Sequence, residues 1–262
     1  MQTLRIGVAS RGFQQPLKQS LKTASDMGAR GIQFDVRNEL RPQDLSESGR
    51  RQFLHLLDEL DLQVDSFYLP TRRSLYDLEY LDDRLAGFRS AMLFASQLGA
   101  RVLTARIGRI PADTASSEYE ILRQVLGDLA RYGNHVGVTL AVIPSGDPAA
   151  NMLQLITQIT EGPVGVDFDP AGFVMSDHDP VDALRTLHAL IVHMQARDGL
   201  KDIDGSGLEV PLGRGEVDWG EFVALVHEIE YGGWVTVTRS QGDDVLGDSA
   251  RAIRYLRQLT FQ

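Results

Sequence analysis

Short runs rich in Val, Ile and Leu alternate along the chain with longer segments whose apolar residues recur at helical spacing. The apolar runs predict eight strands: Leu4–Ser10, Gly31–Val36, Gln63–Leu69, Arg101–Ile107, Thr139–Ile143, Val164–Phe168, one beginning at Ile191, and Gly233–Thr238. The other segments predict helices near Leu17–Met27, Ser46–Leu60, Asp82–Leu98, Ser117–Tyr132, Ala149–Ile159, Pro180–Ala189, Trp219–Glu230 and Leu246–Leu259. This alternation predicts parallel strands joined by crossover helices.

Eight such units in 262 residues are typical of a closed (β/α)8 barrel. No linker, low-complexity tract or shift in composition interrupts the pattern, which predicts a single TIM-barrel domain over residues 1–262. The alternative is an open doubly wound sheet, which usually has fewer strands and a glycine fingerprint after the first one. Here the first strand ends in Ala9-Ser10-Arg11-Gly12-Phe13 without that fingerprint, so we favour the barrel.

Composition narrows the classes of function. The absence of cysteine excludes disulfides, thiolate zinc sites and a cysteine nucleophile. A net charge of −10 argues against general binding to nucleic acids or anionic membranes. The N-terminal residues already have a strand pattern and lack the regions of a signal peptide, and no apolar run is long enough to span a bilayer. We therefore expect a cytoplasmic protein without nucleic-acid or membrane partners.

In a barrel, the residues at the carboxyl ends of the strands form the site. The candidates there are Asp35, Arg106, Asp169, Gln195, Arg197, Asp198, Thr238 and Arg239. Arginines gather at this rim, and guanidinium groups bind carboxylates or phosphates in a bidentate way, which predicts a small anionic ligand. The equally weighted alternative is internal ion pairing, of Arg197 with Asp198 or Asp169 and of Arg106 with Asp35.

Two aspartates on one strand point to chemistry. Asp167 and Asp169 alternate, so both carboxylates enter the lumen, where like charges need a counter-ion, a proton or a metal. Asp169 is the strongest catalytic candidate and Asp35 the second. His193, on the following strand, fits a buried, hydrogen-bonded core histidine better than a functional one.

A short glycine loop around Arg214 precedes the helix that begins near Trp219. The amide groups of such a loop can bind an anion, which makes Arg214 a candidate for substrate binding. The alternative is a connector that needs glycine only for its backbone angles, and for so short a motif taken alone this alternative is preferred.

Five motifs carry a resemblance to a known family. They are Gly31-Ile-Gln-Phe-Asp35, Gly137-Val-Thr-Leu-Ala141, Val166-Asp-Phe-Asp-Pro170 with Asp179-Pro180, Val192-His-Met-Gln-Ala-Arg-Asp198, and Val210-Pro-Leu-Gly-Arg-Gly-Glu-Val-Asp-Trp219. With these motifs the chain resembles the xylose isomerase-like barrels, a superfamily that includes sugar phosphate isomerases and epimerases and the endonuclease IV type of DNA-repair enzyme. The resemblance covers nearly the whole chain, in register.

The resemblance implies a divalent metal held by a Glu, an Asp or Glu, a His and a Glu that end four successive strands. These positions fall on Ile143, Asp169, Gln195 and Thr238, and Gly172 stands where a His or Asn usually follows. One carboxylate with a neutral amide holds such an ion weakly, so we expect no metal or other cofactor. The glutamates that commonly transfer protons in the epimerases are absent as well.

Three hypotheses for function follow. The first is a sugar or sugar-phosphate isomerase or epimerase of carbohydrate metabolism, with a rearranged site whose base is Asp35, Asp169 or Asp198. The second is a metal-free, non-catalytic homologue that binds a carbohydrate or an anionic, sugar-like small molecule. The third, an endonuclease on abasic DNA, is disfavoured by the missing ligands and by the acidic charge. Whether catalysis is retained, and the oligomeric state, stay open from the sequence.

Overall fold

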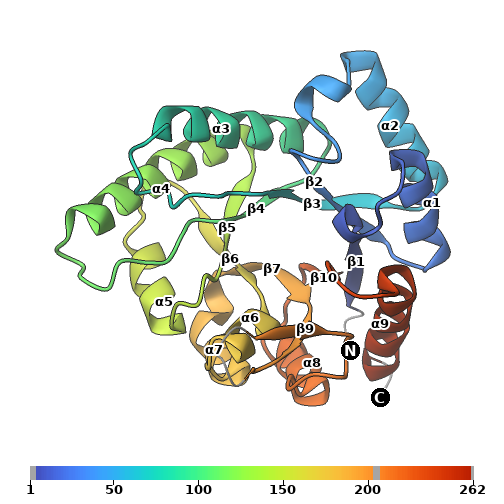
Figure 1. The fold of residues 1–262 in the computed structure, drawn as a ribbon. Coiled ribbons are helices and arrows are strands. Elements are labelled where there is room, and N and C mark those ends of the chain that lie inside the picture. Colours follow the sequence, from blue (N-terminus) through green and yellow to red (C-terminus); the bar gives the residue numbers. More distant parts are fainter. Residues whose placement is uncertain (1–3, 203–206, 261–262) are drawn as a thin grey trace.

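Eight parallel strands close into a barrel in the computed structural model, which describes residues 4–202 and 207–260 (Figure 1). They are β1 (Arg5–Ala9), β2 (Gly31–Asp35), β3 (Gln63–Leu69), β4 (Val102–Arg106), β5 (Thr139–Ile143), β6 (Val164–Phe168), β7 (Ile191–Ala196) and β10 (Trp234–Val237). Each strand pairs in parallel with its neighbour in the chain, and β10 closes the ring on β1. The predicted barrel is therefore confirmed.

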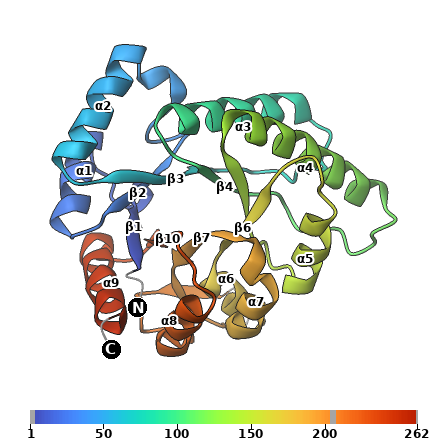
Figure 2. The same ribbon diagram turned by 180° about the vertical axis from the view of Figure 1, so that it is seen from behind.

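Helices surround the barrel, as the two opposite views show (Figures 1 and 2). They are α1 (Leu17–Asp26), α2 (Glu47–Glu59), α3 (Leu81–Gln97), α4 (Ser117–Val136), α5 (Ala149–Thr157), α6 (Pro170–Met175), α7 (Pro180–Leu187), α8 (Trp219–Glu228) and α9 (Val245–Thr260). Side-chain oxygens of Ser46, Ser116, Asp179 and Asp218 cap α2, α4, α7 and α8, because each accepts a first-turn amide that has no helical partner.

A small antiparallel ribbon lies outside the barrel sheet. Strand β8 (Asp198–Leu200) pairs with β9 (Leu208–Val210), within a stretch where the sequence predicted only a loop. The short helix α6 was not predicted either. Elements of three to six residues are too short to display a hydrophobic period, which explains both omissions.

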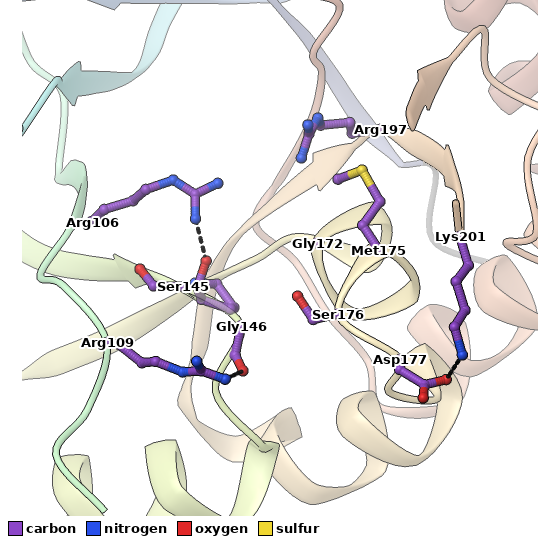
Figure 3. Close-up of a pocket in the computed structure, with 11 residues that line it drawn as sticks. Arg106, Arg109, Ser145, Gly146, Gly172, Met175, Ser176, Asp177, Arg197 and Lys201 are labelled. Atoms are coloured by element: carbon purple, nitrogen blue, oxygen red, sulfur yellow. Dashed lines mark hydrogen bonds and ion pairs between the residues drawn. The ribbon is translucent and has the colours of Figure 1, made fainter. Parts of the chain in front are cut away.

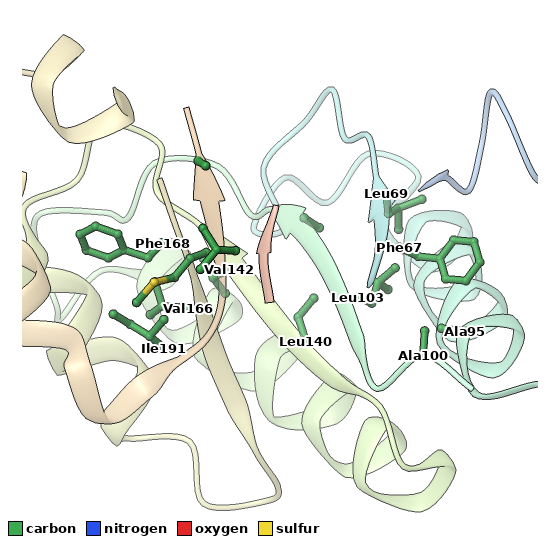
Figure 4. Packing of buried hydrophobic residues seen from close by; sticks show 14 of the residues in the cluster. Phe67, Leu69, Ala95, Ala100, Leu103, Leu140, Val142, Val166, Phe168 and Ile191 are labelled. Atoms are coloured by element: carbon green, nitrogen blue, oxygen red, sulfur yellow. The ribbon is translucent and has the colours of Figure 1, made fainter. Parts of the chain in front are cut away.

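The apolar core fills the layer between the strands and the helices. Phe34, Phe67 and Phe94 form one chain of ring contacts, with centroids 6.1 and 5.4 Å apart. Phe168 contacts Phe173 and Phe222 on the other side of the barrel. Figure 4 shows Phe67 and Phe168 in these two regions, with Leu103, Leu140 and Val142 on the strands between. Among the described residues, no helix combines the length and the apolar character needed to cross a membrane.

Candidate functional site

Inside the barrel, five polar side chains form what we call the lumen network: Asp65, Ser66, Asp167, His193 and Thr236. All five are fully buried or nearly so. His193 Nδ1 lies 2.7 Å from Asp167 Oδ1, and Gln195 Nε2 donates to Asp167 Oδ2 at 2.8 Å. His193 is fully buried and its ring nitrogens contact only members of this network, which agrees with the expected core role.

The contacts of the lumen network place the His193 ring between two aspartates. Ser66 and Thr236 donate their hydroxyl protons to Asp65, at 2.7 and 2.9 Å. The same two hydroxyl oxygens lie 3.1 and 3.0 Å from His193 Nε2, and His193 Nδ1 lies 2.7 Å from Asp167 Oδ1. Burial alone would lower the pKa of His193, but the Asp167 carboxylate outweighs it and raises that pKa.

Asp65 has an unusual pKa for a carboxyl group. Burial raises the pKa of Asp65 from 3.8 to about 6, although His193 and the two hydroxyl groups favour the charged form. Asp65 and Asp167 thus flank His193 within one buried network. The network lies one layer below Asp169, beneath the barrel mouth, so we assign it to the floor of the site.

Asp169 lies one layer above Asp167 and forms an ion pair with an arginine. Arg197 Nη1 donates to Asp169 Oδ2 at 2.8 Å, and Arg106 Nη2 lies 4.0 Å from the same oxygen. The other oxygen, Oδ1, caps α6 by accepting the Gly172 amide at 3.1 Å. A Cβ at Gly172 would lie 2.9 Å from Asp169 Oδ2, so this close approach favours glycine. Asp169 is thus committed to Arg197 and to the start of α6.

A cleft of about 650 Å³ opens at the carboxyl ends of β4 to β7. We call it the cationic cleft, because its lining includes Arg106, Arg109, Arg197 and Lys201. Figure 3 shows Arg106 and Arg109 on one side and Arg197 and Lys201 on the other. Asp177 is the acid in the lining, and Lys201 pairs with it at 2.5 Å.

Backbone carbonyls, which carry no full charge, hold the two arginines of the first wall. Arg106 Nη1 donates to the Pro144 carbonyl at 2.5 Å, and Arg109 Nη2 to the Gly146 carbonyl at 3.4 Å. The buried Ser145 Oγ has no hydrogen-bond partner within the described chain. These groups leave a positive potential at the cleft and one unused, buried hydroxyl in its wall.

The second wall is held by Glu209, on the unpredicted strand β9. Its carboxylate accepts from Arg197 Nε at 2.8 Å, from Arg239 Nη1 at 3.2 Å and from the Ser240 amide at 2.8 Å. Burial opposes the charge on Glu209, but the bonds from Arg197 and Ser240 outweigh it and lower its pKa. Asp169 and Glu209 together raise the pKa of Arg197 further above its ordinary value. The ribbon thereby fixes Arg197 from above.

Asp198 fills the glycine loop with a carboxylate of the chain itself. Asp198 Oδ2 accepts the amides of Gly213 (2.8 Å) and Gly215 (3.1 Å) and the indole of Trp219 (3.1 Å). A Cβ at Gly215 would lie 2.1 Å from Asp198 Oδ1, which explains the glycine. Because these donors are already satisfied by Asp198, they are not available to a ligand anion. This corrects the anion-binding interpretation of the loop.

The remaining candidates lie apart from the cationic cleft. Asp35 accepts from the amides of Arg37 and Asn38 (2.8 and 2.9 Å), so it stabilises its own turn and forms no ion pair with Arg106. Arg239 is paired with Glu209 and, at 3.0 Å, with Asp248. Thr238 Oγ1 donates to the Thr236 carbonyl at 3.3 Å. Arg214 is exposed on its loop.

Sequence reasoning missed residues of the barrel mouth and of its floor. Glu209 at the mouth follows no predicted strand, and Asp65 in the floor lies within β3 between Val64 and Ser66. Glu39, whose pKa is raised by burial, lies in a turn after β2 and accepts the Asp35 amide at 2.8 Å. The one available signal was Asp65, because a carboxylate inside a barrel strand must face either the lumen or the apolar helix layer.

A family model described as a xylose isomerase-like TIM barrel matches residues 21–259. The chain belongs to this family. A xylose isomerase domain protein from Planctomyces limnophilus is a similar solved structure, with a TM-score of 0.87, 23% identity and 98% of both chains covered. No protein with a curated function matches the sequence.

Two further solved structures resemble the fold at lower identity. One, from Mycobacterium smegmatis, was solved in complex with magnesium and has a TM-score of 0.80, 17% identity and coverage of 99% of this chain and 98% of that one. The other, an L-ribulose 3-epimerase, has a TM-score of 0.81 and 14% identity, with 99% and 95% covered. At these identities the likeness shows the fold.

The residues of this chain do not fit a divalent metal at the family position. Ile143 offers no donor, Gln195 directs its amide nitrogen to Asp167, and Thr238 directs its hydroxyl proton to a carbonyl. Asp169 already binds Arg197, whose guanidinium supplies the positive charge a metal would bring. Among the described residues, no three His, Cys, Asp or Glu side chains lie together in a way that would hold a metal ion.

Proposed function

We propose that this member of the family binds a small, anionic, sugar-like molecule in the cationic cleft without a divalent metal. One observation carries the proposal: four cationic side chains line the cleft, while its acid Asp177 is paired with Lys201. A volume of about 650 Å³ is within the range of small-molecule sites. Guanidinium groups bind phosphate and carboxylate oxygens through two parallel hydrogen bonds, which suits Arg106 and Arg109.

The test is calorimetric titration with glucose 6-phosphate and with glucose, in the presence of a chelator. We expect the phosphate to bind at least about tenfold more tightly, a difference of about 1.4 kcal/mol, and its affinity to fall with salt. Arg109→Gln should weaken phosphate binding, whereas Arg51→Gln, an exposed arginine on α2, is the matched control and should not. Equal affinities for the two sugars would refute the proposal.

Isomerase or epimerase activity is the second candidate function, favoured by the family and by the epimerases among the similar structures. Asp169 is the acid at a family position and would have to leave Arg197 to accept a proton. The test is proton exchange: incubation with keto-sugars and their phosphates in D₂O should replace a carbon-bound hydrogen, visible by NMR. No exchange over days at high protein concentration would leave binding as the function.

A further inference from the structure

The barrel mouth contains an arginine that the ion pairs described above do not include. Arg11 follows β1 in the short 3-10 helix Ser10–Gly12. Its guanidinium donates to Gln33 Oε1 and lies over the Tyr68 ring, 4.6 Å from the centroid. Within residues 4–202 and 207–260 it forms no ion pair and no other hydrogen bond. A partly buried guanidinium with five donors thus has one neutral acceptor.

This condition separates Arg11 from Arg197 and Arg239, two other largely buried arginines of the mouth. Arg197 has Asp169 and Glu209, and Arg239 has Glu209 and Asp248. Each of those charges is balanced by direct contact. Glu39 and Asp167 act on Arg11 only through space. Removing a cation partly from water costs free energy unless an anion binds beside it.

The position of Arg11 is fixed by its surroundings. Ser10 Oγ donates to the Gln33 carbonyl at 3.1 Å, and a Cβ at Gly12 would lie 2.2 Å from the Arg239 carbonyl oxygen. The turn therefore packs tightly between β2 and the end of β10. Tyr68 covers one face of the guanidinium and Gln33 accepts from Nη1, so the remaining donors of Arg11 are held in a fixed position.

Arg11 also lies close to the cationic cleft along the barrel mouth. Its strand β1 and the strand that precedes Arg197, β7, both pair with β10. The turn of Arg11 packs against the Arg239 backbone, and Glu209 joins Arg239 to Arg197, which lines the cleft. A single extended ligand can contact both Arg11 and the cleft when it carries an acidic group at each end.

We infer that Arg11 forms a second anion subsite, so that the preferred ligand is a doubly acidic sugar derivative with a phosphate in the cationic cleft and a carboxylate at Arg11. The inference rests on the proposed function, because it assumes that the cleft takes the first anion. A carboxylate suits a single guanidinium edge, whereas the larger phosphate suits a cleft lined by several cations.

Two open-chain probes differ at one carbon and separate the two proposals. Sorbitol 6-phosphate carries a hydroxymethyl group where 6-phosphogluconate carries a carboxylate. We expect the unmodified protein to bind 6-phosphogluconate about tenfold more tightly, and Arg11→Gln to abolish that difference while leaving sorbitol 6-phosphate binding within about twofold.

Arg5→Gln is the matched control. Arg5 also lies over an aromatic ring, Trp234 at 4.1 Å, and donates to a glutamine, Gln63 Oε1 at 3.1 Å, but it starts β1 at the opposite end of the barrel. Its loss should change neither affinity.

Equal binding of the two probes by the unmodified protein would overturn the subsite and leave the proposed function intact, and this measurement needs no variant. An equal loss for both probes in Arg11→Gln would also overturn it, because Arg11 would then support the fold or the cleft alone. Failure of both probes to bind would overturn the proposed function and the subsite together.

Discussion

Three aspartates that end strands of this barrel differ in the donors they meet. Asp35 accepts amides of its own turn, Asp198 accepts the amides of a distant loop, and Asp169 meets the guanidinium of Arg197. Only Asp169 borders the cationic cleft through its partners. The same residue type at equivalent strand ends thus serves a turn, a loop and a site, because the local donors decide which role each carboxylate has.

At this scale, Asp65 gives a prediction about pH. The unfolded chain releases this proton near pH 3.8, whereas the folded protein keeps it until about pH 6. Between these values the folded state binds more protons, so the contribution of Asp65 to the free energy of unfolding falls as pH rises. The shift corresponds to about 3 kcal/mol, since one pKa unit is about 1.4 kcal/mol.

Asp65→Asn removes this contribution. The free energy of unfolding of the variant minus that of the unmodified protein should therefore increase by about 3 kcal/mol from about pH 4 to about pH 7. Urea unfolding at a series of pH values measures it, with the exposed Asp58→Asn as control. A difference that does not change with pH would mean that Asp65 titrates normally.

Among the elements, the β8–β9 ribbon does most to shape the mouth. Its Glu209 side chain is 5% exposed and joins Arg197 to Arg239, each of which has a further carboxylate partner. The ribbon therefore connects the ends of β7 and β10 through charges. This connection holds the Arg197 guanidinium at the edge of the cationic cleft.

Glu209→Gln should lower the free energy of unfolding by about 2 kcal/mol, because a buried carboxylate between two guanidinium groups is replaced by a neutral amide. Urea unfolding measures it. The control is Glu221→Gln, which breaks an exposed contact with Arg185 at 3.6 Å and should cost under about 0.5 kcal/mol. Similar losses in the two variants would show that the ribbon adds nothing beyond a surface ion pair.

The barrel could be predicted because its strands and helices are long enough to display their periods. The site could be predicted only in part. Arg106, Asp169 and Arg197 were found by counting to strand ends, but Arg197 is held by Glu209, which lies on a strand of three residues. Arg11 stood at a strand end too, yet its missing counter-ion is a property of the assembled mouth that no local pattern contains.

At the scale of the whole molecule, the charge around the cleft is opposite in sign to the net charge. The protein carries a net charge of −10, yet one face of the barrel gathers Arg106, Arg109, Arg197 and Lys201 around a cleft. A local positive field on an acidic surface attracts small anions while the total charge repels polyanions. The selectivity expected here is therefore for small ligands.

The whole-molecule prediction concerns metals. Ligands that bind the native state raise stability by RT ln(1 + [L]/Kd), so about 1 mM metal at a micromolar site would add about 4 kcal/mol. Because Asp169 already forms an ion pair with Arg197, we expect no change in the melting temperature with Mn²⁺, Mg²⁺, Co²⁺ or Zn²⁺. Stoichiometric metal bound through Asp169 and Gln195 would contradict this.

The companion variant combines Ile143→Glu, Gln195→His and Thr238→Glu, which restores the ligand types of the family. It should gain metal-dependent thermal stability, because Asp169 is already in place and a dication competes with Arg197 for it. An unresponsive triple variant would indicate that Arg197 holds Asp169 too firmly for a metal to displace it.

The loop around Gly213 and Gly215 is a carboxylate-binding site that the Asp198 side chain of the same chain occupies. The substitution Asp198→Gly removes this carboxylate, whereas the two amides and the Trp219 indole remain as donors. Added formate or acetate would then restore, in a dose-dependent way, the stability that the substitution removes. Removing the Asp198 side chain would therefore turn this loop into a binding site for small carboxylates.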